Sequence, residues 1–283
     1  MIDTPATGEH PLVSGLPTPP VIEATARTDV GLRRQVNEDA MLAEHPVYIV
    51  ADGMGGHDAG DLASRAAVAA FQGLPGIAGN LGVADVDAAI DAARAAVAAV
   101  AVGTERGAGC TLTGAVMIEH EGAPHWYVVN IGDSRVYQFS SAGLTQITDD
   151  HSLHAELAAA GRAEAAETPR NVITRALGSD DTRHDGWLLP VVTGSRMLMC
   201  SDGLTTELDD EEIRAVLAVG GRSEAVADEL VRRALEAGGR DNVTAIVVDT
   251  ISSGSAGTGP IELVGDDEAD TLETIEVTRP VRS

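Results

Sequence analysis

The sequence has little positive charge, few cysteines and no long apolar run, and each shortage excludes a class of function. Lys and Arg together number 19 against 44 Asp and Glu, which gives a formal net charge of −25 at pH 7. That charge repels the phosphodiester backbone of nucleic acids and also an anionic membrane surface. We therefore expect no nucleic-acid partner.

Membrane insertion and secretion are not expected either. No segment has the roughly 18 to 20 consecutive apolar residues that a membrane-spanning helix requires. The first 20 residues contain five prolines and lack the basic start and apolar core of a signal peptide. These features predict a soluble, cytoplasmic protein.

Thiol chemistry and the common nucleotide-binding loops are absent as well. Cys110 and Cys200 lie in apolar runs typical of strands, and neither begins the Cys-x-x-x-x-x-Arg loop of a thiol phosphatase. Neither a Gly-x-Gly-x-x-Gly loop after a strand nor a Walker-type phosphate loop occurs. Both cysteines are predicted to be reduced core residues.

Composition divides the chain into one folded unit and two tails. Residues 1–20, rich in Pro and Thr, cannot bury enough apolar surface to offset the entropy of ordering, which predicts a flexible arm. Residues 250–283 change to Ser, Gly and Thr and then to an acidic stretch, a composition typical of a flexible tail. A single folded domain is expected at residues 21–249.

Short β-rich runs with mostly hairpin spacing dominate this unit and predict antiparallel strands. The predicted strands are 47–51, 112–119, 125–131, 135–140, 144–147, 196–200 and 243–249. The predicted helices are 61–72, 86–102, 153–160, 210–219 and 224–237. Asp209 and Glu212 have the spacing of a capping box, and Gly238 follows the last helix. We expect an α+β fold with two antiparallel sheets packed face to face beneath helical outer layers.

Carboxylates recur where these strands begin or end. Two strands finish in an Asp-Gly pair, with Asp52 and Asp202 as the acids, and Asp241 comes just before the last strand. Antiparallel pairing can bring these three together. Asp133 lies in a tight turn, predicted to be a hairpin, that can reach the same rim.

Two interpretations of these acids are open. Asp-Gly pairs are ordinary turn formers, because Asp bonds its own backbone and Gly adopts positive φ. Clustered carboxylates, however, are costly unless a cation neutralises them. Mg²⁺ and Mn²⁺ prefer carboxylate, carbonyl and water ligands, so the recurrence in one context favours a metal site.

The stretch from Arg34 to Asp39 adds a guanidinium to two further acids, Glu38 and Asp39. Arg presents a planar fork of donors that suits a phosphate dianion. A charged stretch of this kind, taken alone, is more often a solvated loop.

Eight motifs, in order from about residue 21 to 249, resemble the metal-dependent Ser/Thr protein phosphatases, the type 2C or PPM family, in its bacterial form. They are Arg34-x-x-Asn37-Glu38-Asp39, Ala51-Asp52-Gly53-Met54-Gly55-Gly56-His57, Gly109-Cys110-Thr111-Leu112-Thr113, Gly132-Asp133-Ser134-Arg135, Asp150-His151-Ser152, Asn171-x-Ile173-Thr174-Arg175-Ala176-Leu177-Gly178, Ser201-Asp202-Gly203-Leu204 and Gly239-Arg240-Asp241-Asn242-Val243-Thr244.

The resemblance implies a four-layer α-β-β-α sandwich with the metal site at one end. It also implies two Mn²⁺ or Mg²⁺ ions and a possible third. The metal ligands that it implies are Asp52 as a bridge, the Gly53 carbonyl, Asp202 and Asp241, with Asp133 beside Asp202 at the third position. Arg34 would hold the phosphoryl group, with Glu38 and Asp39 as further catalytic acids, Glu38 acting mainly through metal-bound water.

The activity that the resemblance implies is hydrolysis of phosphoserine and phosphothreonine by metal-activated water, without a covalent phosphoenzyme. Met54 departs from eukaryotic relatives, which carry His there as the inferred general acid, and His57 is a nearby alternative. Residues 153–171 fit the mobile flap of the family, which we expect to gate or sample substrates.

The expected partners are Ser/Thr-phosphorylated proteins and the Ser/Thr kinases that this enzyme would oppose in bacterial signalling. Two alternatives are a phosphatase of anti-anti-sigma regulators and a catalytically silent, phospho-dependent interaction module. Thr271 and Thr274 lie among acids in the tail, where phosphorylation would create a docking site for a phosphothreonine-reading domain. A plain solvating tail is the alternative there.

Overall fold

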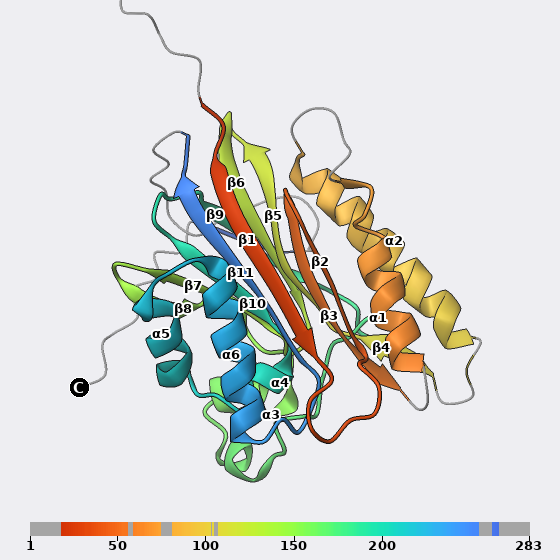
Figure 1. Cartoon of the computed structure of the whole chain (residues 1–283). Coiled ribbons are helices and arrows are strands. Elements are labelled where there is room, and N and C mark those ends of the chain that lie inside the picture. Colours follow the sequence, from red (N-terminus) through yellow and green to blue (C-terminus); the bar gives the residue numbers. More distant parts are fainter. Residues whose placement is uncertain are drawn as a thin grey trace, which may run out of the picture.

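Two antiparallel sheets face each other in the computed structural model, which describes residues 18–55, 59–74, 81–102, 104, 107–254 and 262–265 (Figure 1). One sheet has the order β1 (Val21–Asp29), β11 (Val243–Ser252), β10 (Arg196–Cys200), β7 (Arg135–Ser140) and β8 (Gly143–Gln146). The other has the order β12 (Glu262–Gly265), β9 (Asp185–Pro190), β6 (Ala123–Ile131), β5 (Leu112–His120), β3 (Val47–Gly55) and β2 (Asp39–Glu44), with β4 (Ala108–Cys110) paired to β3.

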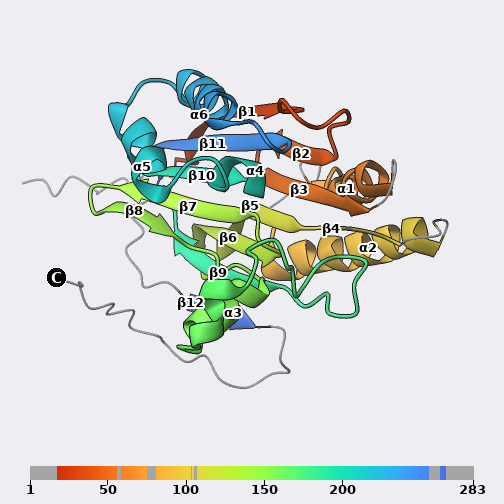
Figure 2. The ribbon, with the colours of Figure 1, turned by 90° about the horizontal axis from the view of Figure 1, so that it is seen from below.

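Helices cover the two outer faces. The first sheet packs against α5 (Asp210–Val219) and α6 (Ser223–Ala237), and the second against α1 (Ala59–Ala69) and α2 (Val83–Val102). Figure 2 shows α5 and α6 on one outer side, α2 on the other, and the strands between them. The short α4 (Asp202–Thr205) follows β10, and α3 (Leu153–Ala159) with the 3₁₀ helix η2 (Ala163–Glu167) lies between β8 and β9. The predicted four-layer α+β sandwich is confirmed.

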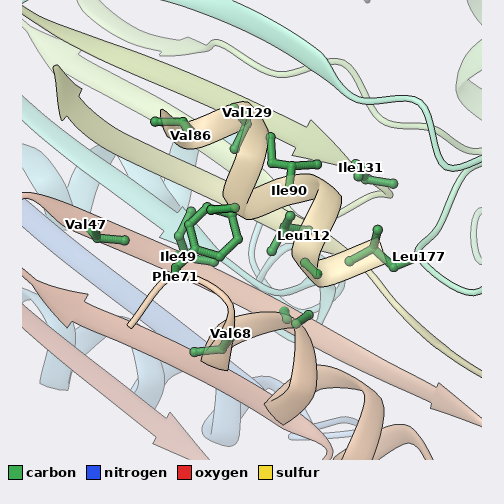
Figure 3. Close-up of a cluster of buried hydrophobic side chains, with 14 of the residues drawn as sticks. Val47, Ile49, Val68, Phe71, Val86, Ile90, Leu112, Val129, Ile131 and Leu177 are labelled. Atoms are coloured by element: carbon green, nitrogen blue, oxygen red, sulfur yellow. The ribbon is translucent and has the colours of Figure 1, made fainter. Parts of the chain in front are cut away.

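Both faces of the central strands are buried, which explains their continuous apolar sequences. In β3, Ile49 packs with Phe71 and Ile90 beneath the helices (Figure 3), whereas Tyr48 and Val50, on either side of it in the sequence, enter the core between the sheets. This alternation is the period of two that side chains follow along a strand. Each large apolar side chain buried in this way contributes about 1.5–3 kcal/mol to stability.

The predicted and observed elements agree best where burial is complete. Strands β7 and β10 and helix α5 have the predicted bounds, the Asp209–Glu212 capping box forms, and Cys110 and Cys200 are buried free thiols. Five strands were not predicted: β1, β2, β4, β9 and β12. Several of these strands are short or lie at a sheet edge. Such strands do not need a continuous run of apolar residues, which is the pattern that predicted the other strands.

The predicted hairpin at Asp133 is wrong. Strand β6 pairs with β5 and β9, whereas β7 pairs with β10 and β8, so the turn crosses from one sheet to the other. A tight turn suits either connection, and only the pairing partners of the strands decide between them.

The ends of the predicted domain differ slightly from the structure. Strand β11 continues to Ser252, and β12 pairs with β9 inside the predicted tail of residues 250–283. Residues 1–17 and 266–283, with Thr271 and Thr274, lie outside the described residues. Within the described part of the chain, no helix is both long and apolar enough to cross a bilayer.

The backbone approaches itself closely where β10 ends. A Cβ atom on Gly203 would lie 1.9 Å from the carbonyl oxygen of Asn242, immediately before β11. The Ser201 amide donates to the Thr244 carbonyl at 3.1 Å, which holds the two segments together. Glycine at position 203 therefore keeps Asp202 beside Asp241.

We predict that Gly203→Ala lowers the free energy of unfolding by about 1–3 kcal/mol, the usual cost of overpacking. Gly73→Ala is the matched control, because a Cβ there meets no atom within 4 Å, and we expect a change within about 0.5 kcal/mol. Urea denaturation followed by circular dichroism measures both. Equal stability of the two variants would contradict the close approach at Gly203.

Candidate active site

Five aspartates gather at one end of the sandwich, where several strands begin or end. Asp39 opens β2 and pairs in register with Asp52 of β3. Asp202 is the first residue of α4, directly after β10, and Asp241 lies two residues before β11. Asp133 lies in the crossing between β6 and β7. The structure therefore brings together all the aspartates that the sequence predicted for the site.

Mutual repulsion and burial act on these carboxyl groups. Burial, together with the negative charges of Asp39, Asp202, Asp133 and Asp241, raises the pKa of Asp52 well above its usual range. Burial and the charge of Asp241 also raise the pKa of Asp202, although a hydrogen bond with Asp52 lowers it. A hydrogen bond between two carboxyl groups requires a proton, which is the expected response when no cation is bound.

Asp133 and Asp39 are the most enclosed members of the cluster. Burial, and then the charge of Asp202, raises the pKa of Asp133 to about 7. Burial raises the pKa of Asp39 to about 7, against hydrogen bonds from Thr244 and Ser201 that lower it. Both groups would therefore hold a proton near neutral pH unless a positive charge replaced it.

A divalent cation fits this donor set. The Oδ1 atom of Asp39 is buried and has no hydrogen-bond partner, so it is open to a further polar group. Within the described ranges, no group of three or more Asp, Glu, His or Cys side chains is arranged to hold a metal ion by itself. Mg²⁺ commonly binds through one or two carboxylates and keeps several waters. The carboxylates therefore suit hydrated Mg²⁺ or Mn²⁺.

Hydroxyl groups hold the other oxygen of Asp39 in place. Ser201 Oγ donates to Asp39 Oδ2 at 2.8 Å, and Thr244 Oγ1 donates to the same atom at 2.6 Å. Both hydroxyl residues belong to motifs that resemble the family, but the sequence assigned them no role of their own. Their bonds span 162 and 205 positions, so only the folded chain reveals them.

Asn242 fastens the loop that carries Arg34. Its Nδ2 atom donates to the carbonyl oxygens of Val30 and Val36 at 2.9 and 3.0 Å. Its Oδ1 atom accepts from the Glu38 amide at 2.8 Å. Sequence reasoning missed this role as well. Asn242 directly follows Asp241 in the chain. The same residue therefore anchors the loop of Arg34, the candidate phosphate ligand, beside one of the clustered carboxylates.

Arg34 reaches from this loop to the rim of the cluster. Its Nη2 atom lies 2.7 Å from Asp241 Oδ2, and Nη1 lies 3.7 Å from Glu38 Oε2. The Arg34 side chain is 47% exposed, whereas that of Glu38 is 16% exposed. The guanidinium therefore faces solvent and the carboxylates at once, and a phosphate group could approach it from outside.

The backbone near Gly53 is fixed by two contacts. The Gly53 amide donates to the Glu38 carbonyl at 3.1 Å, and the Asp52 amide donates to Thr111 Oγ1 at 2.9 Å. Thr111 Oγ1 also lies 2.9 Å from Ser134 Oγ, next to Asp133. This hydroxyl pair links the two carboxylate positions. His57, the alternative general acid, lies outside the described residues.

Comparisons with known proteins point to one family. A family model described as protein phosphatase 2C matches residues 32–246. The serine/threonine protein phosphatase PstP of Mycobacterium tuberculosis is 38% identical over 265 residues, which cover 89% of this chain and 50% of PstP. The serine/threonine phosphatase stp of Listeria monocytogenes is 33% identical over 245 residues, covering 81% of this chain and 96% of that protein.

Solved structures agree in fold. The catalytic domain of PstP in complex with two manganese ions superposes with a TM-score of 0.75 at 36% identity, covering 82% of this chain and all of that one. This chain spans about half the length of the full mycobacterial relative. The matches in sequence and in structure extend over the whole domain that carries the aspartate cluster, and the chain belongs to the protein phosphatase 2C family.

Proposed function

We propose that this chain is a metal-dependent protein phosphatase that hydrolyses phosphoserine and phosphothreonine in other proteins. One observation carries the proposal: five aspartates, several with raised pKa, crowd one end of the sandwich beside an exposed arginine. Crowded acids need a cation, and an adjacent guanidinium suits a phosphate dianion. Relatives over the same domain are named serine/threonine phosphatases, which supports this reading.

Asp52, Asp202, Asp241 and the Gly53 carbonyl would hold two Mn²⁺ or Mg²⁺ ions, with Asp133 at a third position beside Asp202. Divalent cations bound there would lower the pKa of a water nucleophile and neutralise charge on the phosphoryl oxygens. The partly exposed surfaces of Asp202 and Asp241 leave an approach from solvent.

The remaining residues bind and orient. Arg34 would form hydrogen bonds to two oxygens of the phosphoryl group through its fork of N–H donors. Glu38, near its Nη1 atom, helps to fix the guanidinium plane. Asp39, whose Oδ2 is held by two hydroxyl groups, offers its unpaired Oδ1 to a water molecule.

The biological setting is part of the same proposal. The substrates would be Ser/Thr-phosphorylated proteins in the cytoplasm, and the opposing enzymes would be Ser/Thr kinases.

The segment 153–171, which contains α3 and η2, would gate access to the site as the flap. The Leu153 amide donates to the Val172 carbonyl at 2.8 Å and so joins the two ends of this segment. The silent interaction module and the anti-anti-sigma phosphatase remain the competing functions.

The first prediction from the proposed function concerns turnover. With Mn²⁺, the chain should release phosphate from p-nitrophenyl phosphate and from a phosphothreonine peptide, and EDTA should abolish this. Asp241→Asn should lower kcat by at least about 100-fold, because a bound cation supplies several kcal/mol of charge stabilisation. Asp180→Asn, an exposed acid outside the cluster, is the control. A wild-type chain that binds Mn²⁺ but releases nothing would favour the interaction module.

The second prediction concerns phosphate binding. Arg34→Lys should lower kcat/KM by about 10- to 100-fold, because loss of a charge-assisted hydrogen bond costs about 1.5–3 kcal/mol. The neighbouring and exposed Arg33 provides the control, Arg33→Lys, for which we expect little change. Steady-state kinetics on the phosphothreonine peptide measures both. Equal effects of the two substitutions would remove Arg34 from the site.

The third prediction concerns stability without metal. A raised carboxyl pKa means that the folded chain keeps a proton which the unfolded chain has lost, so stability falls as pH rises from about 4 to about 7. Each such group contributes about 1.4 kcal/mol per pH unit inside this window.

Asp39→Asn removes one such group. In EDTA the variant should therefore be more stable than wild type at pH 8, with a smaller difference at pH 4.5, and Mn²⁺ should reduce the wild-type loss. Urea denaturation at the two pH values measures this, with Asp180→Asn as the control. A wild-type stability in EDTA that changes with pH no more than that of Asp39→Asn would contradict the raised pKa.

A further inference from the structure

A buried histidine outside the carboxylate cluster connects two parts of its support. The His151 ring is 4% exposed. The Gly132 amide donates to its Nδ1 atom at 3.1 Å, and its Nε2 atom lies 3.1 Å from Asp185 Oδ2. An amide can donate only to a ring nitrogen without a proton, so the imidazole is neutral and its proton is on Nε2. That N–H donates to Asp185.

Asp185 is itself well anchored. It is the first residue of β9 and pairs in register with Asn130 of β6. Arg175 Nη1 donates to its Oδ1 atom at 2.9 Å and lies farther, at 3.4 Å, from His151 Nε2. Burial alone would raise the pKa of Asp185, but the hydrogen bond from His151 and the charge of Arg175 lower it. Asp185 is therefore a fixed, ionised acceptor for the Nε2 proton.

His151 bonds both the amide and the carbonyl group of Gly132, and so holds the peptide groups on both sides of this residue. Its carbonyl oxygen accepts from the His151 amide at 2.9 Å and from Asn130 Nδ2 at 3.0 Å, while its own amide donates to the His151 ring. Gly132 has φ of +113°, and a Cβ there would lie 2.6 Å from Thr111 Cγ2. The orientation of this peptide determines where the carboxylate of the next residue, Asp133, points.

We propose that His151, held in its Nε2–H tautomer by Asp185, is a positioning residue that aims Asp133 at a divalent cation beside Asp202. This inference rests on the proposed function, because it requires a cation at Asp133. His151 itself contacts neither phosphate nor cation. In the opposite tautomer, the ring Nδ1–H and the Gly132 N–H would point at each other inside the protein. The turn at Gly132 would then move to separate the two donors.

The tautomer gives the test its specificity. Asp185→Asn offers the ring a side chain that can donate as well as accept, so the Nε2–H tautomer is no longer enforced. His151→Leu removes the acceptor for the Gly132 amide altogether. His151→Asn keeps one, because Asn Oδ1 occupies nearly the position of Nδ1 and has no tautomers. The double variant His151→Asn/Asp185→Asn then tests whether Asp185 affects Mn²⁺ binding through the His151 imidazole.

The experiment titrates Mn²⁺ into the metal-free full chain and records free Mn²⁺ by electron paramagnetic resonance. Asp133→Asn first identifies the binding step that depends on Asp133. Asp185→Asn and His151→Leu should weaken that step by about 10- to 100-fold, the range for residues that orient metal ligands. His151→Asn should stay close to wild type, and Asp185→Asn should add no further loss in that background.

Controls separate positioning from general damage. His154→Asn changes a nearby histidine whose ring bonds the Ala165 carbonyl instead, and should leave Mn²⁺ binding unchanged. Thermal unfolding followed by circular dichroism identifies any variant that fails to fold. If His151→Leu does not fold, the effect of Asp185→Asn in the wild-type and His151→Asn backgrounds carries the test.

Three outcomes would overturn the inference in different ways. If Asp133→Asn weakens binding but Asp185→Asn does not, His151 has no positioning role and the proposed function stands. If Asp185→Asn weakens binding equally in both backgrounds, Asp185 acts without the ring. If the wild-type chain binds no Mn²⁺ and releases no phosphate, the proposed function itself fails.

Discussion

Mutual repulsion among five aspartates at one end of the sandwich is the constraint on which the rest of the site depends. Carboxylates placed this close destabilise the folded chain unless protons or cations neutralise them. Burial first, and then the charges of neighbouring aspartates, raises the pKa values of Asp39, Asp52, Asp133 and Asp202. The two sheets and their three apolar cores supply the stability that permits it.

Neutral hydrogen-bonding groups, rather than further charges, hold the acids in place. Hydroxyl groups of Ser201 and Thr244 bind Asp39, Thr111 supports the Asp52 backbone, and Asn242 fastens the loop of Arg34. Such groups orient a carboxylate without filling the space beside it with a positive charge, so a cation can still bind. Arg34 is different, because it lies at the rim, where its charged group faces both the acids and solvent.

Prediction from sequence worked best where local pattern and burial agree. Strand β10 is apolar after its first residue, Arg196, because both of its faces are covered, and α5 begins at the capping box of Asp209 and Glu212. Edge strand β1 alternates too weakly to be recognised, since much of it is exposed. The tight turn at Asp133 suits a hairpin as well as a crossing between sheets, because a turn does not reveal which sheet the next strand joins.

The sequence by itself determined the chemistry of the site: acids at strand ends, an arginine ahead of them, and no thiol nucleophile. These residues can be recognised in the sequence because they lie in or near short local motifs, such as an Asp-Gly pair at the end of a strand. Only the tertiary structure decided how they are supported, since Thr244 meets Asp39 across 205 positions and His151 meets Asp185 across 34. Contacts between such distant residues leave no local pattern, because they form only when the sheets pack and the strands pair in register.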